Sequence, residues 1–128
     1  MVAILDNQYQ EPQRAQSCAV PVIAERWVLT AAHCVTAENG NATITLVIGT
    51  AIFSTGGKRV HLHRIVAHPQ WDRMSDANDT ALLHTAVSLW IANVQMVDLA
   101  DTTMPLGADM VIAGWGIRFR DDPGSSFV

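Results

Sequence analysis

The run Trp27-Val28-Leu29-Thr30-Ala31-Ala32-His33-Cys34 joins a buried strand pattern directly to a titratable ring. Its first four residues are aromatic, aliphatic or β-branched, which is typical of a strand, and the two alanines leave room for a close backbone turn. Imidazole changes charge near neutral pH, so a histidine held at a strand end suits proton transfer. A core histidine with satisfied ring nitrogens is nevertheless the commoner case. The local residues leave both interpretations open.

Length and composition favour one globular domain. The chain has 128 residues, of which 49% are hydrophobic and 16% charged, and its mean hydropathy is +0.18. This length suffices for a real core, and the high hydropathy indicates apolar surface that a partner covers. A net charge of −4, with no basic cluster beyond Lys58-Arg59, argues against a nucleic-acid or anionic-membrane surface. No run of about 20 apolar residues predicts a membrane span.

Short β-branched and apolar runs alternate with turn residues, and no long segment has a helical period. We therefore predict an all-β fold, a closed antiparallel barrel of about six strands. Pro21 lacks an amide hydrogen, so the run that contains it should be irregular there or lie at a sheet edge. The polar residues 6–16 are expected to form a loop. The expected strands are residues 1–5, 18–24, 27–30, 43–48, 60–66, 78–85 and, as the last, 109–114.

Three motifs carry a resemblance to a known family. The run 27–34 resembles the histidine motif of trypsin-like (chymotrypsin-fold) serine proteases, nearly verbatim. Asn78-Asp79-Thr80-Ala81-Leu82-Leu83 resembles that family's aspartate motif, and Ala113-Gly114-Trp115-Gly116 resembles the segment before its interdomain crossing. Order and spacing also agree. The resemblance implies a Greek-key barrel, the first of the family's two, over residues 1–116, with residues 117–128 beginning the interdomain linker.

The same resemblance assigns roles to four residues. It implies that His33 is a general base, that Asp79 is the carboxylate orienting it, and that Cys18 and Cys34 form a disulfide. On local chemistry alone, Asp79 would be a turn aspartate that caps backbone amides, and the two cysteines could equally be reduced, buried thiols. A disulfide would indicate a secreted, extracellular protein.

The family's nucleophile has no counterpart in this sequence. None of the six serines lies in the Gly-Asp-Ser-Gly context that the family uses; they are Ser17, Ser54, Ser75, Ser88, Ser125 and Ser126. The sequence also departs from the family after the first cysteine, where Ala19-Val20-Pro21 stands in place of two glycines and a serine. The oxyanion hole and specificity pocket belong to the family's second barrel. We therefore expect the chain alone to be inactive.

Several residues are of types that often mark modification or metal sites. Asn41 begins a glycosylation sequon in an expected surface loop, whereas a glycan on Asn78 would obstruct the site, so we expect Asn78 to be unmodified. His61 and His63 alternate onto one strand face, but no third ligand is apparent and a solvated face is the commoner case. His68 matches a structural turn of the family. No metal, no calcium site and no other cofactor is predicted.

Three functional interpretations follow. The first is the N-terminal half of a secreted trypsin-like endopeptidase that acts on protein or peptide substrates once a second barrel completes it. In that case the chain begins inside the domain, because the activation site and the new N-terminus that precede the family's first strand are not in this sequence. The second is a non-catalytic relative that binds proteins, with association through the face that the second barrel would cover. The third is an unrelated β-domain, which the three ordered motifs disfavour.

Overall fold

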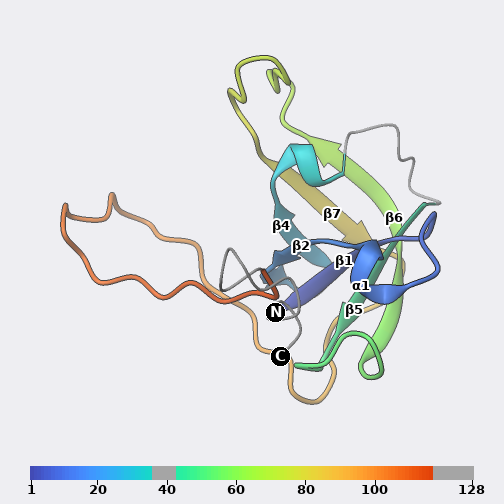
Figure 1. Cartoon of the computed structure of the whole chain (residues 1–128). Coiled ribbons are helices and arrows are strands. Elements are labelled where there is room, and N and C mark those ends of the chain that lie inside the picture. The colour runs from blue at the N-terminus through green and yellow to red at the C-terminus, as the bar shows by residue number, and fades with distance from the viewer. Residues whose placement is uncertain (36–42, 117–128) are drawn as a thin grey trace, which may run out of the picture.

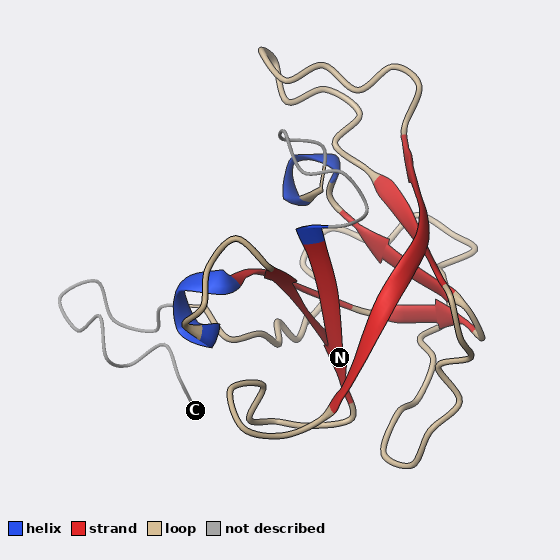
Figure 2. Ribbon diagram, turned by 90° about the vertical axis from the view of Figure 1, so that its right-hand side faces the viewer, coloured by secondary structure: helices blue, strands red, loops and turns tan. Residues whose placement is uncertain are grey.

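The computed structural model describes residues 1–35 and 43–116. Within them, seven strands form one antiparallel sheet in the order β2-β1-β5-β6-β7-β4-β3. The predicted all-β antiparallel barrel is confirmed (Figures 1 and 2). The elements are β1 (Val2–Asp6), α1 (Pro12–Ala15), β2 (Gln16–Val20), β3 (Val22–Ala24), β4 (Trp27–Thr30), the 3-10 turn η1 (Ala32–Cys34), β5 (Ile44–Ile48), β6 (Lys58–Ala67) and β7 (Ala81–Thr85).

Pro21 interrupts the chain where the two ends of the sheet meet. Strands β2 and β3 are the outermost members of the strand order, yet only Pro21 separates them in sequence. The sheet therefore curls around until its edges come together (Figure 2). Because proline cannot donate to a ladder, the strand expected over residues 18–24 is broken at this point, as predicted. From there β3 turns back into β4 as an antiparallel hairpin.

Strand β6 connects the two halves of the barrel. It pairs with β5 up to His61 and with β7 from Leu62 onward. The register with β7 shifts between Leu62 and Arg64, where β6 contains one residue more, His63, than the facing stretch of β7. Such a bulge bends a strand and redirects its side chains. Both His63 and Arg64 are consequently exposed, although they are consecutive.

Two apolar clusters lie on opposite faces of the sheet, because side chains alternate along a strand. The barrel interior holds aliphatic side chains that are no more than 1% exposed: Val2, Ile4, Val22, Val28, Leu46, Ile48, Val60 and Leu83. Each such side chain contributes about 1.5–3 kcal/mol to folding. A smaller cluster outside the barrel contains Ala3, Leu5, Val47, Phe53 and Trp115, with Ala15 of α1.

The outer cluster anchors the last described part of the chain. The Trp115 indole Nε1–H donates to the Ala51 carbonyl oxygen at 2.7 Å. Its ring meets Phe53 edge to face, with ring centroids 5.5 Å apart. Aromatic pairs favour this arrangement, which adds to the stabilisation by burial. Residue 115 is thereby fixed to the barrel wall.

Two sequence expectations are wrong. Residues 109–114 form no strand: Val111 and Ile112 are 95% and 96% exposed, in an arm that extends away from the barrel (orange, Figure 1). β-branched residues favour a strand only where a neighbouring strand pairs with them. The expected loop over residues 6–16 contains the one-turn helix α1, which Pro12 begins at its first position.

The remaining structural expectations concern residues outside the described ranges. Asn41 and the linker expected over residues 117–128, with Ser125 and Ser126, lie there. Among the residues that are described, no helix is long and apolar enough to cross a lipid bilayer.

Candidate active site

Strand pairing brings His33 and Asp79 together across 46 residues of sequence. Strands β4 and β7 are antiparallel, with Thr30 opposite Ala81. The residues that follow β4 therefore lie beside those that precede β7. His33 lies in η1, just after β4, and Asp79 lies two residues before β7. The ladder thus positions both side chains at one end of the barrel.

Asp79 accepts two hydrogen bonds from the same histidine. The backbone amide of His33 donates to Oδ1 at 2.8 Å, and the ring Nδ1 lies 2.6 Å from Oδ2. A carboxylate can only accept, so Nδ1 carries the hydrogen and the neutral ring keeps its lone pair on Nε2. The side chain of His33 is 59% exposed and that of Asp79 24%. Asp79 therefore holds the ring on its Nδ1 side, while much of the rest of the ring is exposed to solvent.

Several opposing effects act on the carboxyl group of Asp79. Partial burial raises its pKa, but the hydrogen bonds from the ring and amide of His33, electrostatic attraction to that ring and the amide of Ala32 together lower the pKa below its ordinary value. Asp79 is therefore ionised at neutral pH. An ionised carboxylate stabilises a positive charge on the neighbouring imidazole.

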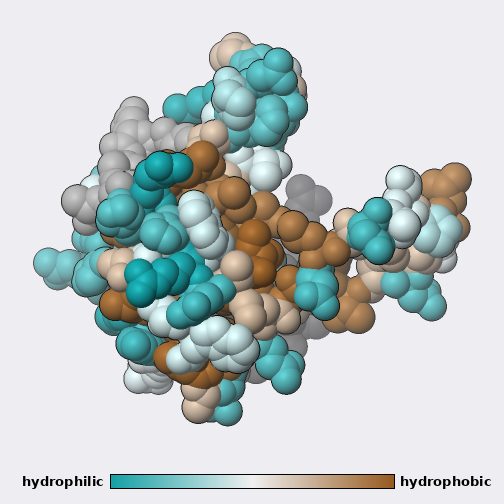
Figure 3. All heavy atoms as spheres, turned by 180° about the vertical axis from the view of Figure 1, so that it is seen from behind, coloured by the Kyte–Doolittle hydropathy of each residue, from teal (hydrophilic) through white to brown (hydrophobic). Residues whose placement is uncertain are grey.

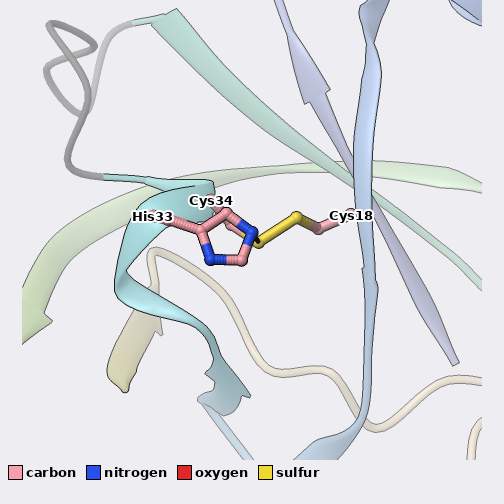
Figure 4. A group of neighbouring side chains, drawn as sticks. All are labelled: Cys18, His33 and Cys34. Atoms are coloured by element: carbon pink, nitrogen blue, oxygen red, sulfur yellow. Dashed lines mark hydrogen bonds between the residues drawn. A yellow bond between two sulfur atoms is a disulfide. The ribbon is translucent and has the colours of Figure 1, made fainter. Parts of the chain in front are cut away.

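The predicted disulfide between Cys18 and Cys34 is present, with Cα atoms 6.2 Å apart. It joins β2 to η1 and lies directly beside the His33 ring (Figure 4). The ring Nε2 is 3.5 Å from Sγ of Cys34. The two sulfurs and the ring nitrogens are close enough to hold a metal ion. Thiolate is the form of cysteine that binds metals, however, so the disulfide leaves His33 as the sole strong ligand of this group.

An open pocket of about 190 Å³ adjoins the histidine. Ser17 is one of its lining residues, together with His33 and Asp6. The Ser17 hydroxyl donates to the carbonyl oxygen of Ile4 at 3.4 Å. Within residues 1–35 and 43–116, the hydrogen-bond partner of the ring Nδ1 is Asp79, and no serine hydroxyl bonds to Nε2. The pocket is therefore lined by the ring of His33, whose bond to Asp79 lies outside the lining residues, and by a serine that is not bonded to that ring.

The structure also locates the other residues considered from the sequence. His68 lies in a turn, where its Nδ1 accepts from the amide of Gln70 at 3.2 Å. Asn78 adopts a positive φ of 58° and its side-chain amide donates to the carbonyl of Gln70 at 3.0 Å. Its lack of modification stays a prediction. The main-chain bonds from His33 and Ala32 to Asp79 were not foreseen, because they depend on the 3-10 turn that follows β4.

Comparison with known proteins gives consistent matches. The family model described as Trypsin matches residues 3–127. Serine protease SP24D of Anopheles gambiae is 35% identical over 120 residues, covering 89% of this chain and 42% of that protein. Trypsin of Sarcophaga bullata is 30% identical over 117 residues, covering 88% and 46%. The solved VesB protease of Vibrio cholerae aligns with a TM-score of 0.65 and 26% identity, over 77% of this chain and 29% of that one.

The chain spans less than half the length of each of these relatives. The match by the family model nevertheless extends over nearly all of its residues. Fold and sequence agree, since the barrel aligns with a solved protease and the motifs around His33 and Asp79 fall within the matched residues. The chain therefore belongs to the trypsin family of serine proteases.

Proposed function

We propose that this chain supplies the general base and the orienting carboxylate of a serine endopeptidase, and that it hydrolyses no peptide by itself. The observation that carries the proposal is the double hydrogen bond from His33 to Asp79. It fixes both the orientation and the tautomer of the ring, which proton transfer to a particular face requires. The Trypsin family match supports peptide-bond hydrolysis as the reaction.

The chemistry of this half-site follows from the tautomer. With Nδ1–H bonded to Asp79, the lone pair on Nε2 can accept the proton of a serine hydroxyl as that oxygen attacks a peptide carbonyl. The imidazolium that forms is stabilised by the ionised carboxylate and then returns the proton to the leaving amine. The attacking serine, the oxyanion hole and the specificity pocket are proposed to come from the second barrel of the family.

The absence of a nucleophile is tested by covalent labelling. Purified chain is incubated with a fluorophosphonate probe, which forms a stable adduct with activated serine hydroxyls, and analysed by intact-mass spectrometry. We expect no adduct, because the Ser17 hydroxyl is bonded to the Ile4 carbonyl instead of to His33. Stoichiometric labelling of a serine that disappears in His33→Ala would refute the proposal.

The proteolytic role is tested by the coding sequence beyond Val128. If it continues into a Gly-Asp-Ser-Gly motif, the full product should cleave peptide substrates. His33→Ala should lower kcat about 10⁶-fold and Asp79→Asn about 10⁴-fold, each with little change in KM, because both residues act mainly in the transition state. A full product with unchanged kcat in either variant would show that this pair is not part of the machinery.

A second candidate, a protein-binding relative without catalysis, is favoured by the apolar arm. The exposed large apolar side chains concentrate between residues 87 and 112, and include Leu106, Met110, Val111 and Ile112. Figure 3 shows hydrophobic surface on the arm and on the adjacent side of the barrel. In the proposed endopeptidase this face is covered by the second barrel. In a binding module it would be covered by another protein instead.

We further propose an extracellular location. The Cys18–Cys34 bond supports it, because disulfides persist in oxidising compartments. Asn41 is then available to the glycosylation machinery. Expression through a secretory pathway should give a mass increase that glycosidase treatment and Asn41→Gln both remove, whereas Asn78→Gln should leave it. A glycan on Asn78 would contradict the proposed arrangement around Asp79.

A further inference from the structure

A pair of histidines lies away from His33 and Asp79. These two histidines face each other from neighbouring strands of the barrel. His63 belongs to the bulge of β6 and His84 to β7, and their Nδ1 atoms are 3.2 Å apart. We propose that His63 and His84 form a two-histidine binding site for a divalent first-row transition-metal ion such as Cu²⁺, Ni²⁺ or Zn²⁺. Neutral imidazole is a preferred ligand of these ions.

The separation of the two nitrogens fits one ion. Bonds from such metals to histidine nitrogen are about 2.0–2.1 Å, which places two ligands of a tetrahedral ion about 3.3 Å apart and two adjacent ligands of an octahedral ion about 2.9 Å apart. The observed 3.2 Å lies between these values. The rings meet edge to face, with an interplanar angle of 74°, so they are not stacked.

The metal would replace a hydrogen bond. In the ion-free pair of neutral rings, the Nδ1–H of one ring donates to the Nδ1 lone pair of the other. When an ion binds, the donating ring moves its hydrogen to Nε2, so both Nδ1 atoms offer lone pairs and no net proton is released. Because both imidazoles reach solvent, water can occupy the other coordination positions.

The fold holds this pair in place. The ladder matches Leu62 to Thr85 and Arg64 to His84, so the bulge leaves His63 beside His84. On its other side, the His84 ring packs on Trp27 of β4, with centroids 4.6 Å apart and an interplanar angle of 41°. One ligand is thus fixed before the ion arrives, which reduces the entropy lost on binding. Arg64 adds positive charge nearby, but its exposed, flexible chain can extend into solvent.

Strand pairing changes which histidines form the candidate site. Alternation along the sequence places His61 and His63 on one strand face. In the structure, His61 is matched to Thr45 of β5, whereas the second histidine for His63 comes from β7. An ion bound by His63 and His84 would cross-link two strands whose ligands are 21 residues apart in sequence. It would therefore bind the folded chain and stabilise it.

The first test is calorimetric titration of the purified chain with NiCl₂ or ZnCl₂. We expect one equivalent to bind, and affinity to fall at least about tenfold, or 1.4 kcal/mol, in both His63→Gln and His84→Gln. His61→Gln is the matched control on the same strand, and His33→Ala removes the catalytic-site histidine; both should bind as the wild type does. Equal affinity in all variants, or a loss confined to His33→Ala, would overturn the proposal.

Tryptophan fluorescence and thermal unfolding give independent readouts. Cu²⁺ should quench the emission of Trp27 because its indole contacts His84, and Trp27→Phe should remove that quenching while binding persists. Zn²⁺ should raise Tm for the wild type and for His61→Gln, but not for His63→Gln. His63 is exposed, so its replacement tests the proposal even if His84→Gln fails to fold. An equal rise in Tm for His63→Gln would contradict it.

Discussion

At the scale of single residues, Asp79 holds one histidine with both of its oxygens. One oxygen accepts a hydrogen bond from the His33 backbone amide, and the other accepts a hydrogen bond from Nδ1 of the ring. In Asp79→Asn, one position becomes an NH₂ group that can only donate. If the remaining side-chain oxygen still accepts the hydrogen bond from the His33 backbone amide, the NH₂ group faces Nδ1 of the ring. Nδ1 must then accept, so the ring carries its hydrogen on Nε2.

We therefore expect Asp79→Asn to convert His33 from the Nδ1–H to the Nε2–H tautomer. Long-range ¹H–¹⁵N correlation spectra of the imidazole distinguish the two forms. Asp76→Asn is the matched control, since Asp76 is exposed in the same loop and its positive φ of 52° also suits asparagine. Unchanged tautomers in Asp79→Asn would show that the carboxylate does not set the position of the hydrogen.

The same carboxylate should make stability depend on acidic pH. The pKa of Asp79 is lower in the folded chain than its ordinary value of 3.8, so the unfolded chain binds the proton more tightly. Its contribution is fully present above the unfolded pKa and is lost as pH falls through the folded pKa. Urea unfolding between about pH 5 and 2 should show a smaller decrease for Asp79→Asn than for the wild type. Parallel curves would contradict this assignment.

The local chemistry of single residues predicted less of the candidate site than the family motifs did. His33 alone suggested a core histidine and Asp79 alone a turn cap, and only the family resemblance paired them. Alternation along β6 could not identify His84 as the neighbour of His63, because the decisive bulge depends on the pairing between β6 and β7. Side-chain partners from distant strands are fixed by register, which a single strand's sequence does not contain.

At the scale of the elements, the disulfide ties β2 to the turn that carries His33. The two cysteines are 16 residues apart in sequence, so on the chain-entropy model the bond stabilises the fold by about 3 kcal/mol. Replacing both cysteines with alanine should lower the free energy of unfolding by about that amount in urea. Wild-type protein kept reduced should behave similarly. A double variant as stable as the oxidised wild type would show that the bond is dispensable.

Strand positions followed from short runs of apolar and β-branched residues wherever a partner strand was available. The break at Pro21 was predictable because proline lacks a donor, whatever the fold around it. Residues 109–114 have a composition typical of a strand, but no neighbouring strand in the described part of the chain pairs with them. They belong to the arm that extends away from the barrel. Helix α1 has only four residues, too few for any helical period to register in the sequence.

At the scale of the whole molecule, the arm exposes large apolar side chains, among them Leu106, Val111 and Ile112. In the absence of a partner, we expect the purified chain to self-associate with rising concentration in sedimentation experiments, because apolar side chains leave water. Val111→Asp combined with Ile112→Asp should weaken that association. Thr102→Asp combined with Thr103→Asp is the control, because both threonines are also exposed on the arm. A sharp monomer boundary at high concentration would count against this expectation.

Trp115 makes the arm a loop with two fixed ends. At the near end, the amide of Val97 donates to the carbonyl of Val22; at the far end, the Trp115 indole is bonded to Ala51. For a loop closed in this way, doubling the number of intervening residues costs only about 0.6 kcal/mol of closure entropy. Gly107, whose surroundings are open, lies near its middle. The arm is thus a place where the chain can accept inserted sequence, such as an affinity epitope, while the barrel beneath it remains folded.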